Sequence, residues 1–310
     1  MRLRISMIAM ALVLLGSSGV SASGGSSPES ARAAAVASGL GLNLPLVARL
    51  VGAGSTLYIT TVDVQNNAVG STQVDWYLNG VNLRTSASIA VAGSISSTGT
   101  LVAQGSGGTM RGRSNAHFED LIDSFSQAGF LPSSIKDDGF IGSLFFVFNG
   151  FQKKGQGTAT ARFFSSSGGG TIGQALKAHE ITVSEPQKLV GIARDTRGKP
   201  GSQLYANIFV NNTGVTPGGV GAVGPVSVQI QAYANSTGQP TGTPLNTAIG
   251  VGQTVGVSDV LAQLKVPSGE DTVLVYVTVT SGTAAIAGVF AEVDAVTRDG
   301  STTDMTRADF

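Results

Sequence analysis

The chain has 310 residues, and its composition excludes several classes of protein before any motif is considered. Charged residues make up 12% of the chain, with 19 basic and 19 acidic residues, so it lacks the basic excess typical of nucleic-acid-binding domains. It contains no cysteine, which excludes disulfides, thiolate catalysis, cysteine-based zinc sites and lipid attachment through cysteine. Packing alone must therefore hold the fold together.

The N-terminus has the three parts of a cleavable signal peptide over residues 1–22. Arg2 and Arg4 precede an apolar stretch of 11 residues, and Val20 and Ala22 occupy the positions expected before a cleavage site. The apolar stretch is about half of the roughly 20 residues that span a membrane, so a permanent anchor is the less favoured alternative. We expect a secreted, periplasmic or cell-surface protein with no integral membrane segment after signal removal. Export without disulfides favours a bacterial origin.

Residues 23–41 are mainly Ser, Gly and Ala and predict a flexible tether, although 28–38 could form a short helix. From Leu42 onward, short runs rich in Val, Ile, Thr, Tyr and Phe alternate with turn residues, a pattern typical of β-sandwiches. The clearest predicted strands cover 57–64, 73–78, 86–95, 141–148, 158–164, 203–210, 226–234, 272–280 and 285–296.

The second half of the chain resembles the first, which predicts two tandem domains. The segments 144–147 and 158–161 have counterparts 130 residues later, and each half places an Asn-Asn pair after an early strand. The fold class predicted is all-β, with two antiparallel β-sandwiches, immunoglobulin-like or jelly-roll-like, each carrying one short helix. The predicted domains are 42–183 and 184–310, the second an internal repeat of the first.

One short amphipathic helix is predicted in each half. In the first, Ser114 suits the N-cap, and the helix would bury a stripe at residues 118, 121, 122 and 125. In the second, Ser258 suits the N-cap before apolar residues 260, 261 and 264. A helix that docks on a membrane or partner is disfavoured, because the first segment is acidic.

Catalytic chemistry has few candidates. The two histidines, His117 and His179, are the possible general bases, and neither lies beside a serine nucleophile elbow. Trp76, the single tryptophan, is adjacent to Tyr77 on a predicted strand, so one ring points inward and the other outward, and Trp76 is expected in the core. We predict no catalytic residues and no enzyme.

Acidic residues gather in two places that a metal could use. Asp137 and Asp138 precede a glycine, and the C-terminal segment carries Asp294, Asp299, Asp304 and Asp309. Neither has the ligand spacing of a calcium loop, so no metal site and no cofactor are predicted. Glu292 and Asp294 lie two apart on one strand, which predicts that they share its solvated face and leaves open a carboxylate pair for glycoside hydrolysis.

The segments around Gly52, Gly54, Thr60 and Asn66-Asn67, together with the strand and turn at 157–174, resemble uncharacterised secreted bacterial proteins with tandem immunoglobulin-like β-sandwich domains. This resemblance implies a fold and a compartment and carries no catalytic residues. We therefore predict a non-catalytic module that binds or assembles with an extracellular protein, a glycan or itself.

Two alternatives remain open. One is a fibre subunit whose segment 42–51 adds as a strand to a neighbour's sheet. The other is a carbohydrate-active enzyme or a carbohydrate-binding protein. Nucleic acid is not an expected partner.

Overall fold

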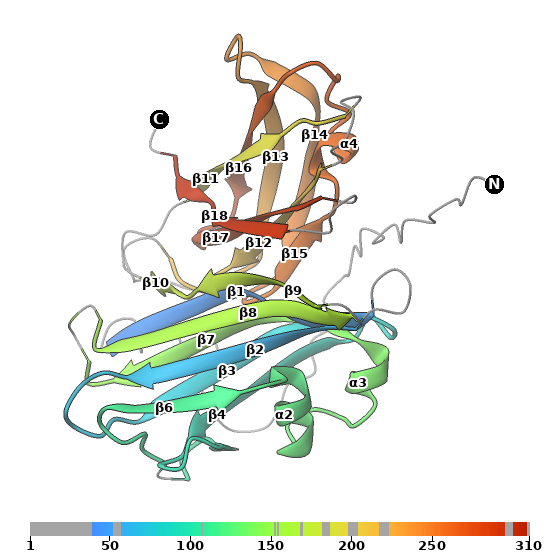
Figure 1. Ribbon diagram of the computed structural model, residues 1–310. Coiled ribbons are helices and arrows are strands. Elements are labelled where there is room, and N and C mark those ends of the chain that lie inside the picture. Colours follow the sequence, from blue (N-terminus) through green and yellow to red (C-terminus); the bar gives the residue numbers. More distant parts are fainter. Residues whose placement is uncertain are drawn as a thin grey trace.

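Figure 1 shows the computed structural model of the chain. The residues that it describes are 39–51, 57–106, 108–151, 153, 155–167, 170–181, 187–197, 204–216, 223–294 and 300–308. The predicted signal peptide over 1–22 and residues 23–38 of the predicted tether lie outside them. Within the described residues, no helix combines the length and apolar character needed to cross a membrane.

The fold is all-β, and every pairing between its named strands is antiparallel. In the first half, ten strands form two facing layers. Sheet 1 contains β5 (Leu101–Ala103), β4 (Ser88–Ile95), β3 (Val74–Asn82), β7 (Phe140–Asn149), β1 (Gly39–Val51) and β10 (His179–Ile181). Sheet 2 contains β6 (Ser114–Phe118), β2 (Leu57–Asn66), β8 (Gly157–Ser167) and β9 (Gly170–Lys177).

Strand β1 belongs to both layers of the first sandwich. It pairs with β7 along most of its length, and its last two residues pair with the start of β2. The register shifts between Leu44 and Val47, where Pro45 cannot donate a ladder hydrogen bond. The resulting bend lets one strand pass from sheet 1 to sheet 2.

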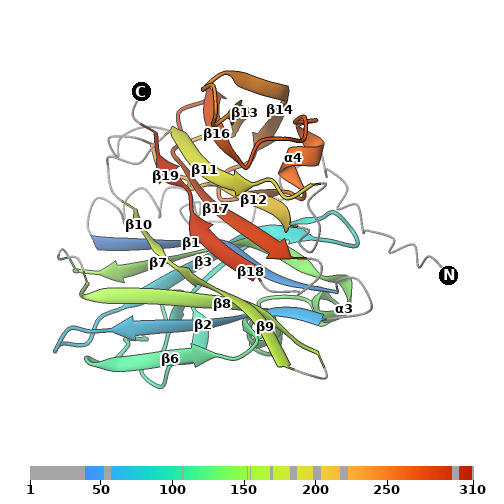
Figure 2. The ribbon, with the colours of Figure 1, turned by 45° about the horizontal axis from the view of Figure 1, so that its top comes forward.

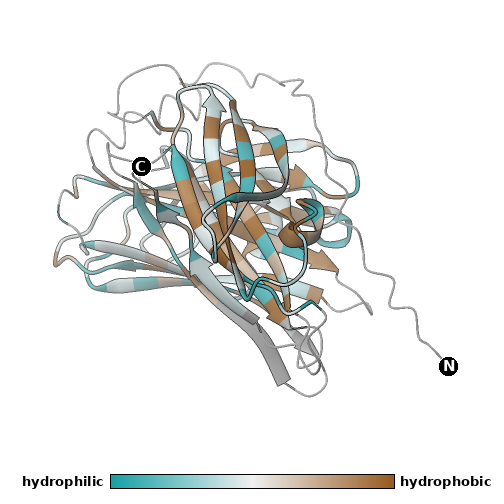
Figure 3. Ribbon diagram, turned by 90° about the horizontal axis from the view of Figure 1, so that it is seen from above, coloured by the Kyte–Doolittle hydropathy of each residue, from teal (hydrophilic) through white to brown (hydrophobic). Residues whose placement is uncertain are grey.

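The second half forms another sandwich. Sheet 3 contains β15 (Thr254–Val257), β12 (Leu204–Asn212), β17 (Ile286–Asp294) and β18 (Gly300–Asp304). Sheet 4 contains β14 (Pro240–Ile249), β13 (Val226–Ala234), β16 (Thr272–Ser281), β11 (Lys188–Arg194) and β19 (Thr306–Arg307). Seen from above, brown and pale bands alternate along strands of this sandwich, as expected when one face of a strand is apolar (Figure 3).

The two sandwiches have the same order of strands. The strand order β4-β3-β7-β1-β10 in sheet 1 corresponds to the order β14-β13-β16-β11-β19 in sheet 4. The strand order β6-β2-β8-β9 in sheet 2 corresponds to the order β15-β12-β17-β18 in sheet 3. A short helix follows β6 and another follows β15.

The 130-residue offset seen in the sequence does not align these strands correctly. Leu144 and Phe146 face the core of the first sandwich, whereas Leu274 and Tyr276, 130 residues later, lie opposite the face on which Val275 and Val277 enter the second core. Side chains alternate between the faces of a strand, so a shift of one residue reverses every assignment. Core-facing residues of the two sandwiches therefore align only when the second is offset from the first by an odd number of residues, as Leu144 and Val275 are.

The strand predictions are confirmed, each to within a few residues, but the tether boundary is wrong. Gly39, Leu40 and Gly41 already belong to β1, where they pair with β7. The leucines at 40, 42, 44 and 46 alternate and are all buried, which is the pattern of a strand. Segment 42–51 is thus a strand paired within its own sandwich, whereas the fibre alternative has it adding to a neighbour's sheet.

Both predicted helix N-caps are wrong. Ser114 begins strand β6, and helix α2 (Leu121–Gln127) is capped by Asp120, whose carboxylate accepts the Asp123 N–H at 3.1 Å. Helix α4 (Val260–Gln263) is capped by Asp259. The apolar residues 121, 122 and 125 are buried as expected. The first half also has a second short helix that was not predicted, α3 (Ile135–Asp138).

Strand β7 lies at the centre of the molecule, and nine of its ten residues are buried. Its inward residues Leu144, Phe146 and Phe148 join the core of the first sandwich, while Phe145 and Val147 point the other way and are also buried. A strand covered on both faces has a continuous apolar sequence in place of an alternating one. The run 144–148, Leu-Phe-Phe-Val-Phe, has this character.

The second sandwich covers the outward face of sheet 1, and Figures 1 and 2 show it lying against the β1 and β7 side of the first. Phe145 and Val147 pack with Tyr77 and with Val215, which follows β12. Asn43 on β1 donates to the Asn211 side chain at 3.0 Å across this interface. Further hydrogen bonds join the two sandwiches, from Ser143 to Gly252 O, from Gln253 Nε2 to Ser88 Oγ, from Thr254 to Pro45 O and from Thr302 to Ala175 O.

Replacing Phe145 with alanine tests this two-sided burial. We expect Phe145→Ala to lower the free energy of unfolding by roughly 3–5 kcal/mol, because a fully buried ring leaves a cavity. The control is Val69→Ala, at a side chain that is 79% exposed, where the change should stay within about 0.5 kcal/mol. Urea unfolding followed by tryptophan fluorescence measures both, and equal values for the two variants would contradict the burial.

Candidate functional site

The outward face of sheet 2 is lined with polar side chains. Along β2 the residues alternate, so Val62 and Val64 enter the core while Asp63 and Gln65 point outward. The ladder places His117 of β6 and Thr160 of β8 on either side of Asp63. It places Asn115 and Thr158 on either side of Gln65 in the same way. The register of three strands thereby gathers residues from three distant parts of the sequence.

His117 lies between two carboxylates on this face. Its Nδ1 lies 2.9 Å from Asp63 Oδ1, and its Nε2 lies 3.2 Å from Glu119 Oε2. The hydrogen bond with Asp63, followed by that with Glu119, raises the pKa of His117 above its ordinary value, and burial only partly opposes this. The imidazole therefore links β6 to β2 through its hydrogen bond with Asp63.

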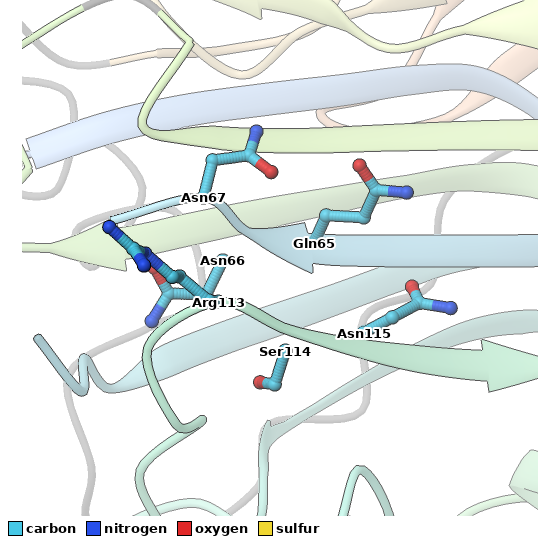
Figure 4. Close-up of a pocket in the computed structure, with 6 residues that line it drawn as sticks. All are labelled: Gln65, Asn66, Asn67, Arg113, Ser114 and Asn115. Atoms are coloured by element: carbon cyan, nitrogen blue, oxygen red, sulfur yellow. The ribbon is translucent and has the colours of Figure 1, made fainter. Parts of the chain in front are cut away.

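A shallow groove of about 430 Å³ opens beside this cluster, at the ends of β2 and β6 (Figure 4). It is lined by Gln65, Asn66, Asn67, Arg113, Ser114 and Asn115. Four of its six lining residues carry a carboxamide or a guanidinium group exposed at the surface, so the groove offers planar groups that donate and accept hydrogen bonds.

Asn66 holds the loop that forms one wall of the groove. It is 1% exposed, and its Nδ2 lies 3.0 Å from both Gly70 O and Arg111 O and 3.3 Å from Met110 O. Its Oδ1 accepts the Ala68 N–H at 3.0 Å. This buried amide ties two loops together at the end of β2, and so positions the segment that leads into Arg113.

Arg113 occupies an unusual backbone conformation at the rim. Its φ is 52°, in the left-handed region that residues other than glycine rarely adopt. A backbone hydrogen bond from Arg113 N to Ala68 O at 2.9 Å holds this conformation. Within the described part of the chain, no carboxylate pairs with its guanidinium, which is exposed and lies on the side of Asn66 and Asn67, away from Asn115 (Figure 4). Strain of this kind gathers at functional sites.

Internal hydrogen bonds orient the amides of the groove. Gln65 Oε1 accepts from the Thr158 hydroxyl at 3.1 Å, so its Nε2 is directed as a donor. Asn115 Nδ2 donates to Asp63 Oδ1 at 3.2 Å, so its Oδ1 is directed as an acceptor. A ligand with hydroxyl groups, each of which both donates and accepts, suits this alternation of donors and acceptors.

The second sandwich has its own charged cluster, at the end near α4. Asp195 is 2% exposed and receives two hydrogen bonds from the Arg197 guanidinium, at 2.9 and 2.8 Å. These bonds raise the pKa of Arg197. Burial, and then the charge of Asp195, raises the pKa of Asp259, although the Ala262 amide and Arg197 lower it. Burial, followed by the charge of Asp259, raises the pKa of Tyr205.

This cluster anchors structure. Arg197 Nη1 also donates to Val266 O at 2.8 Å, and Asp259 caps α4, so the charges tie the strand connection after β11 to the helix. The first sandwich has a similar arrangement: Arg49, near the end of β1, forms an ion pair with Asp120, the N-cap of α2. No group of three or more histidine or acidic residues able to hold a metal is found in the part of the chain that the structure describes.

The residues singled out in the sequence are dispersed. His179 lies 3.3 Å from Asp304, Asp138 accepts hydrogen bonds from Asn82 and Arg84, and Trp76 is buried with its indole N–H donating to Ser94 O at 3.0 Å. The bond from Asn82 is the main cause that lowers the pKa of Asp138. The side chains of Asp294, Asp299 and Asp309 lie outside the described residues.

Glu292 corrects one expectation. It was expected on the solvated face of its strand, but it is 9% exposed, and its carboxylate accepts from the Arg194 backbone N–H at 2.8 Å and from Arg194 Nε at 2.7 Å. A glutamate at this position is buried because its charge is paired.

Sequence patterns had not pointed to Gln65, Asn67, Arg113 or Asn115. Exposed amides on short polar stretches carry no periodic signal, and the strand register that brings β2 beside β6 depends on contacts about 50 residues apart. The Asn66-Asn67 pair is the one signal in the sequence, and its occurrence in both halves indicates a structural feature shared by the two sandwiches.

Comparisons with known proteins add little. No protein-family model matches the chain, and no curated protein matches it in sequence. Among solved structures, a lectin from Pleurotus ostreatus in complex with GalNAc matches with 9% identity and a TM-score of 0.20, over 87% of this chain and 76% of that chain. A likeness at this level carries no argument about function.

The His117 crosslink predicts a pH effect. Replacing Asp63 with asparagine removes the stronger of its two carboxylate partners, so the pKa of His117 should fall toward 6.5. Because the pKa is raised in the folded protein, the stabilisation is full below about pH 6.5 and is lost as the pH rises through the folded value. NMR titration of His117 in the wild-type protein and in Asp63→Asn measures this. A His117 pKa that is the same in both proteins would contradict the crosslink.

Proposed function

We propose that this protein is a non-catalytic, exported module that binds carbohydrate through the outward face of sheet 2, with the groove beside Arg113 as the centre of the site. The observation that supports this most is that the exposed amides of Gln65, Asn67 and Asn115 and the guanidinium of Arg113 line one open groove. Amides and guanidinium groups bind hydroxyl-rich ligands by directional hydrogen bonds.

The shape of the site favours an extended ligand. The groove is shallow and lies at the surface, along the ends of two adjacent strands (Figure 4). Small cofactors are usually enclosed on most sides, whereas a chain of sugar units lies along an open polar face. We infer that several sugar units contact the face, with the Arg113 end of the groove binding an anionic or hydroxyl group.

A binding role fits the surroundings of His117 better than a catalytic one. Both of its ring nitrogens face carboxylates, so neither nitrogen is directed at a hydroxyl nucleophile. Asp63 in turn accepts from His117 and Asn115. These carboxylates are engaged in holding the face together.

Export and bacterial origin belong to the same proposal and are supported by the sequence of residues 1–22 and by the absence of cysteine. The resemblance to secreted proteins with tandem immunoglobulin-like sandwiches, and the origin of the second sandwich as an internal repeat, are proposals supported by the common strand order of the two sandwiches.

Binding to a glycan array, followed by calorimetric titration of the best ligand, tests the function. Arg113→Ala should weaken binding by roughly 10- to 100-fold, since a charged hydrogen-bond donor contributes about 1.5–3 kcal/mol. Asn115→Ala should weaken it less. The control is Arg84→Ala, which removes an exposed arginine that pairs with Asp138 elsewhere on the first sandwich.

Two results would contradict the proposal. One is a protein that binds no glycan on the array. The other is a glycan whose affinity falls equally with Arg113→Ala and Arg84→Ala, because that would place the ligand away from the groove.

A further inference from the structure

Three basic side chains at one end of the first sandwich have no acidic partner. Arg111, Arg113 and Lys153 are exposed on the loops at which β2 ends and β6 and β8 begin. Among the residues that the structure describes, no carboxylate forms an ion pair with any of the three. Elsewhere in the chain, such ion pairs engage other basic residues: Arg49, Arg84, Lys136, Arg194 and Arg197.

The segments that build this end of the sandwich contain no acidic residue. No Asp or Glu occurs at 64–74, 96–116 or 148–158. Asp63, just before the first of these segments, is hydrogen-bonded to His117 and Asn115. Asp75, just after it, is 7% exposed. Basic groups without an internal counterion give this end a positive potential, which attracts anions.

The turn that carries the two arginines is fixed by its own contacts. Gly112 separates them, and a Cβ atom there would lie 1.9 Å from Val69 O, so only glycine lets the two loops pack this closely. The carbonyl oxygen of Arg111 accepts from Asn66 Nδ2 at 3.0 Å and from Ser114 Oγ at 2.6 Å. A backbone held in this way loses little further freedom when a ligand binds, which favours affinity.

Asn67 connects the third basic residue to the groove. The Asn67 backbone N–H donates to Gln156 O at 2.8 Å, and its Nδ2 donates to Gly155 O at 3.0 Å. Gln156 closes a turn with Lys153, whose backbone N–H donates to Gln156 Oε1 at 3.0 Å. The Arg113 guanidinium also lies on the Asn67 side of the groove (Figure 4). The basic residues are therefore attached to the Asn67 end.

We propose that the Asn67 end of the groove is an anion subsite, and that the glycan bound there is acidic, with a carboxylate or a sulfate ester that pairs with Arg113. This inference rests on the proposed function and narrows its ligand class. A guanidinium binds an oxyanion through two parallel hydrogen bonds, which gives the contact direction as well as charge. Arg111 and Lys153 add attraction from the same end.

The opposite end of the groove suits neutral sugar units. Asn115 lies there, and its amide is hydrogen-bonded to the Asp63 carboxylate at 3.2 Å. A second anionic group at this end would be repelled by Asp63. The Gln65 and Asn115 amides therefore remain for hydroxyl groups, and the acidic unit is placed at the Asn67 end.

A glycan array with matched pairs tests the subsite. Glycans with a uronic acid, a sialic acid or a sulfate are each printed beside the same glycan without the acidic group, and the best pair is titrated by calorimetry. The acidic member should bind at least tenfold more tightly, and added salt should weaken its binding alone, because salt screens charge. The member that binds identifies the oxyanion as carboxylate or sulfate.

Variants separate the subsite from general attraction. Arg113→Ala should reduce the preference for the acidic member to less than about threefold, and Arg113→Lys should restore only part of it, because lysine keeps the charge but lacks the planar fork. Lys153→Ala should lower affinity for the acidic member about twofold to threefold. Lys265→Ala is its matched control, since Lys265 is an exposed lysine of the second sandwich, and it should have no effect.

The outcomes distinguish this inference from the proposed function. If the two members of every pair bind equally, or if the best ligand is neutral, the anion subsite is overturned while glycan binding stands. If no glycan binds, the proposed function fails and the inference fails with it. A duplex oligonucleotide that binds as tightly as the acidic glycan would also overturn the inference, because that result would mean a general preference for polyanions.

Discussion

The burial of strand β7 on both of its faces is the constraint on which the rest of the structure depends. Phe146 and Phe148 face the core of the first sandwich, while Phe145 and Val147 face the second, and all four are at most 1% exposed. Such a strand cannot lie at the surface of a lone sandwich without exposing a row of large apolar side chains. The second sandwich is therefore part of the environment that the first requires.

This constraint also decides which surfaces remain for function. With sheet 1 covered by sheet 3, two sheet faces are left outward, and their chemistry differs. Sheet 2 presents Asp63, Gln65 and His117, which bind water or polar ligands well, whereas sheet 4 presents Ile192 and Tyr276. The outward face of sheet 4 also carries Lys188, Arg194 and Gln231, so the two free faces differ in their mixture of side chains although the strand order is the same.

Sequence reasoning reached the fold class and nine strands because runs of β-branched and aromatic residues are strong local signals. It left β1 out of the clearest strands and gave 42–51 as a strand only in the fibre alternative, since a strand built on leucine and containing Pro45 lacks that composition. It placed an N-cap at Ser114, although Ala116 and Phe118 alternate inward as a strand does. The groove could not be predicted, because Gln65 and Asn115 become neighbours only through the register of β2 with β6.

Scanning calorimetry of the full chain tests the central claim, that the two sandwiches form one unit through the outward face of sheet 1. The account predicts a single transition whose calorimetric and van't Hoff enthalpies agree, because neither half keeps its buried surface without the other. Two separate transitions, or a calorimetric enthalpy about twice the van't Hoff value, would show that the sandwiches unfold independently and would contradict the account.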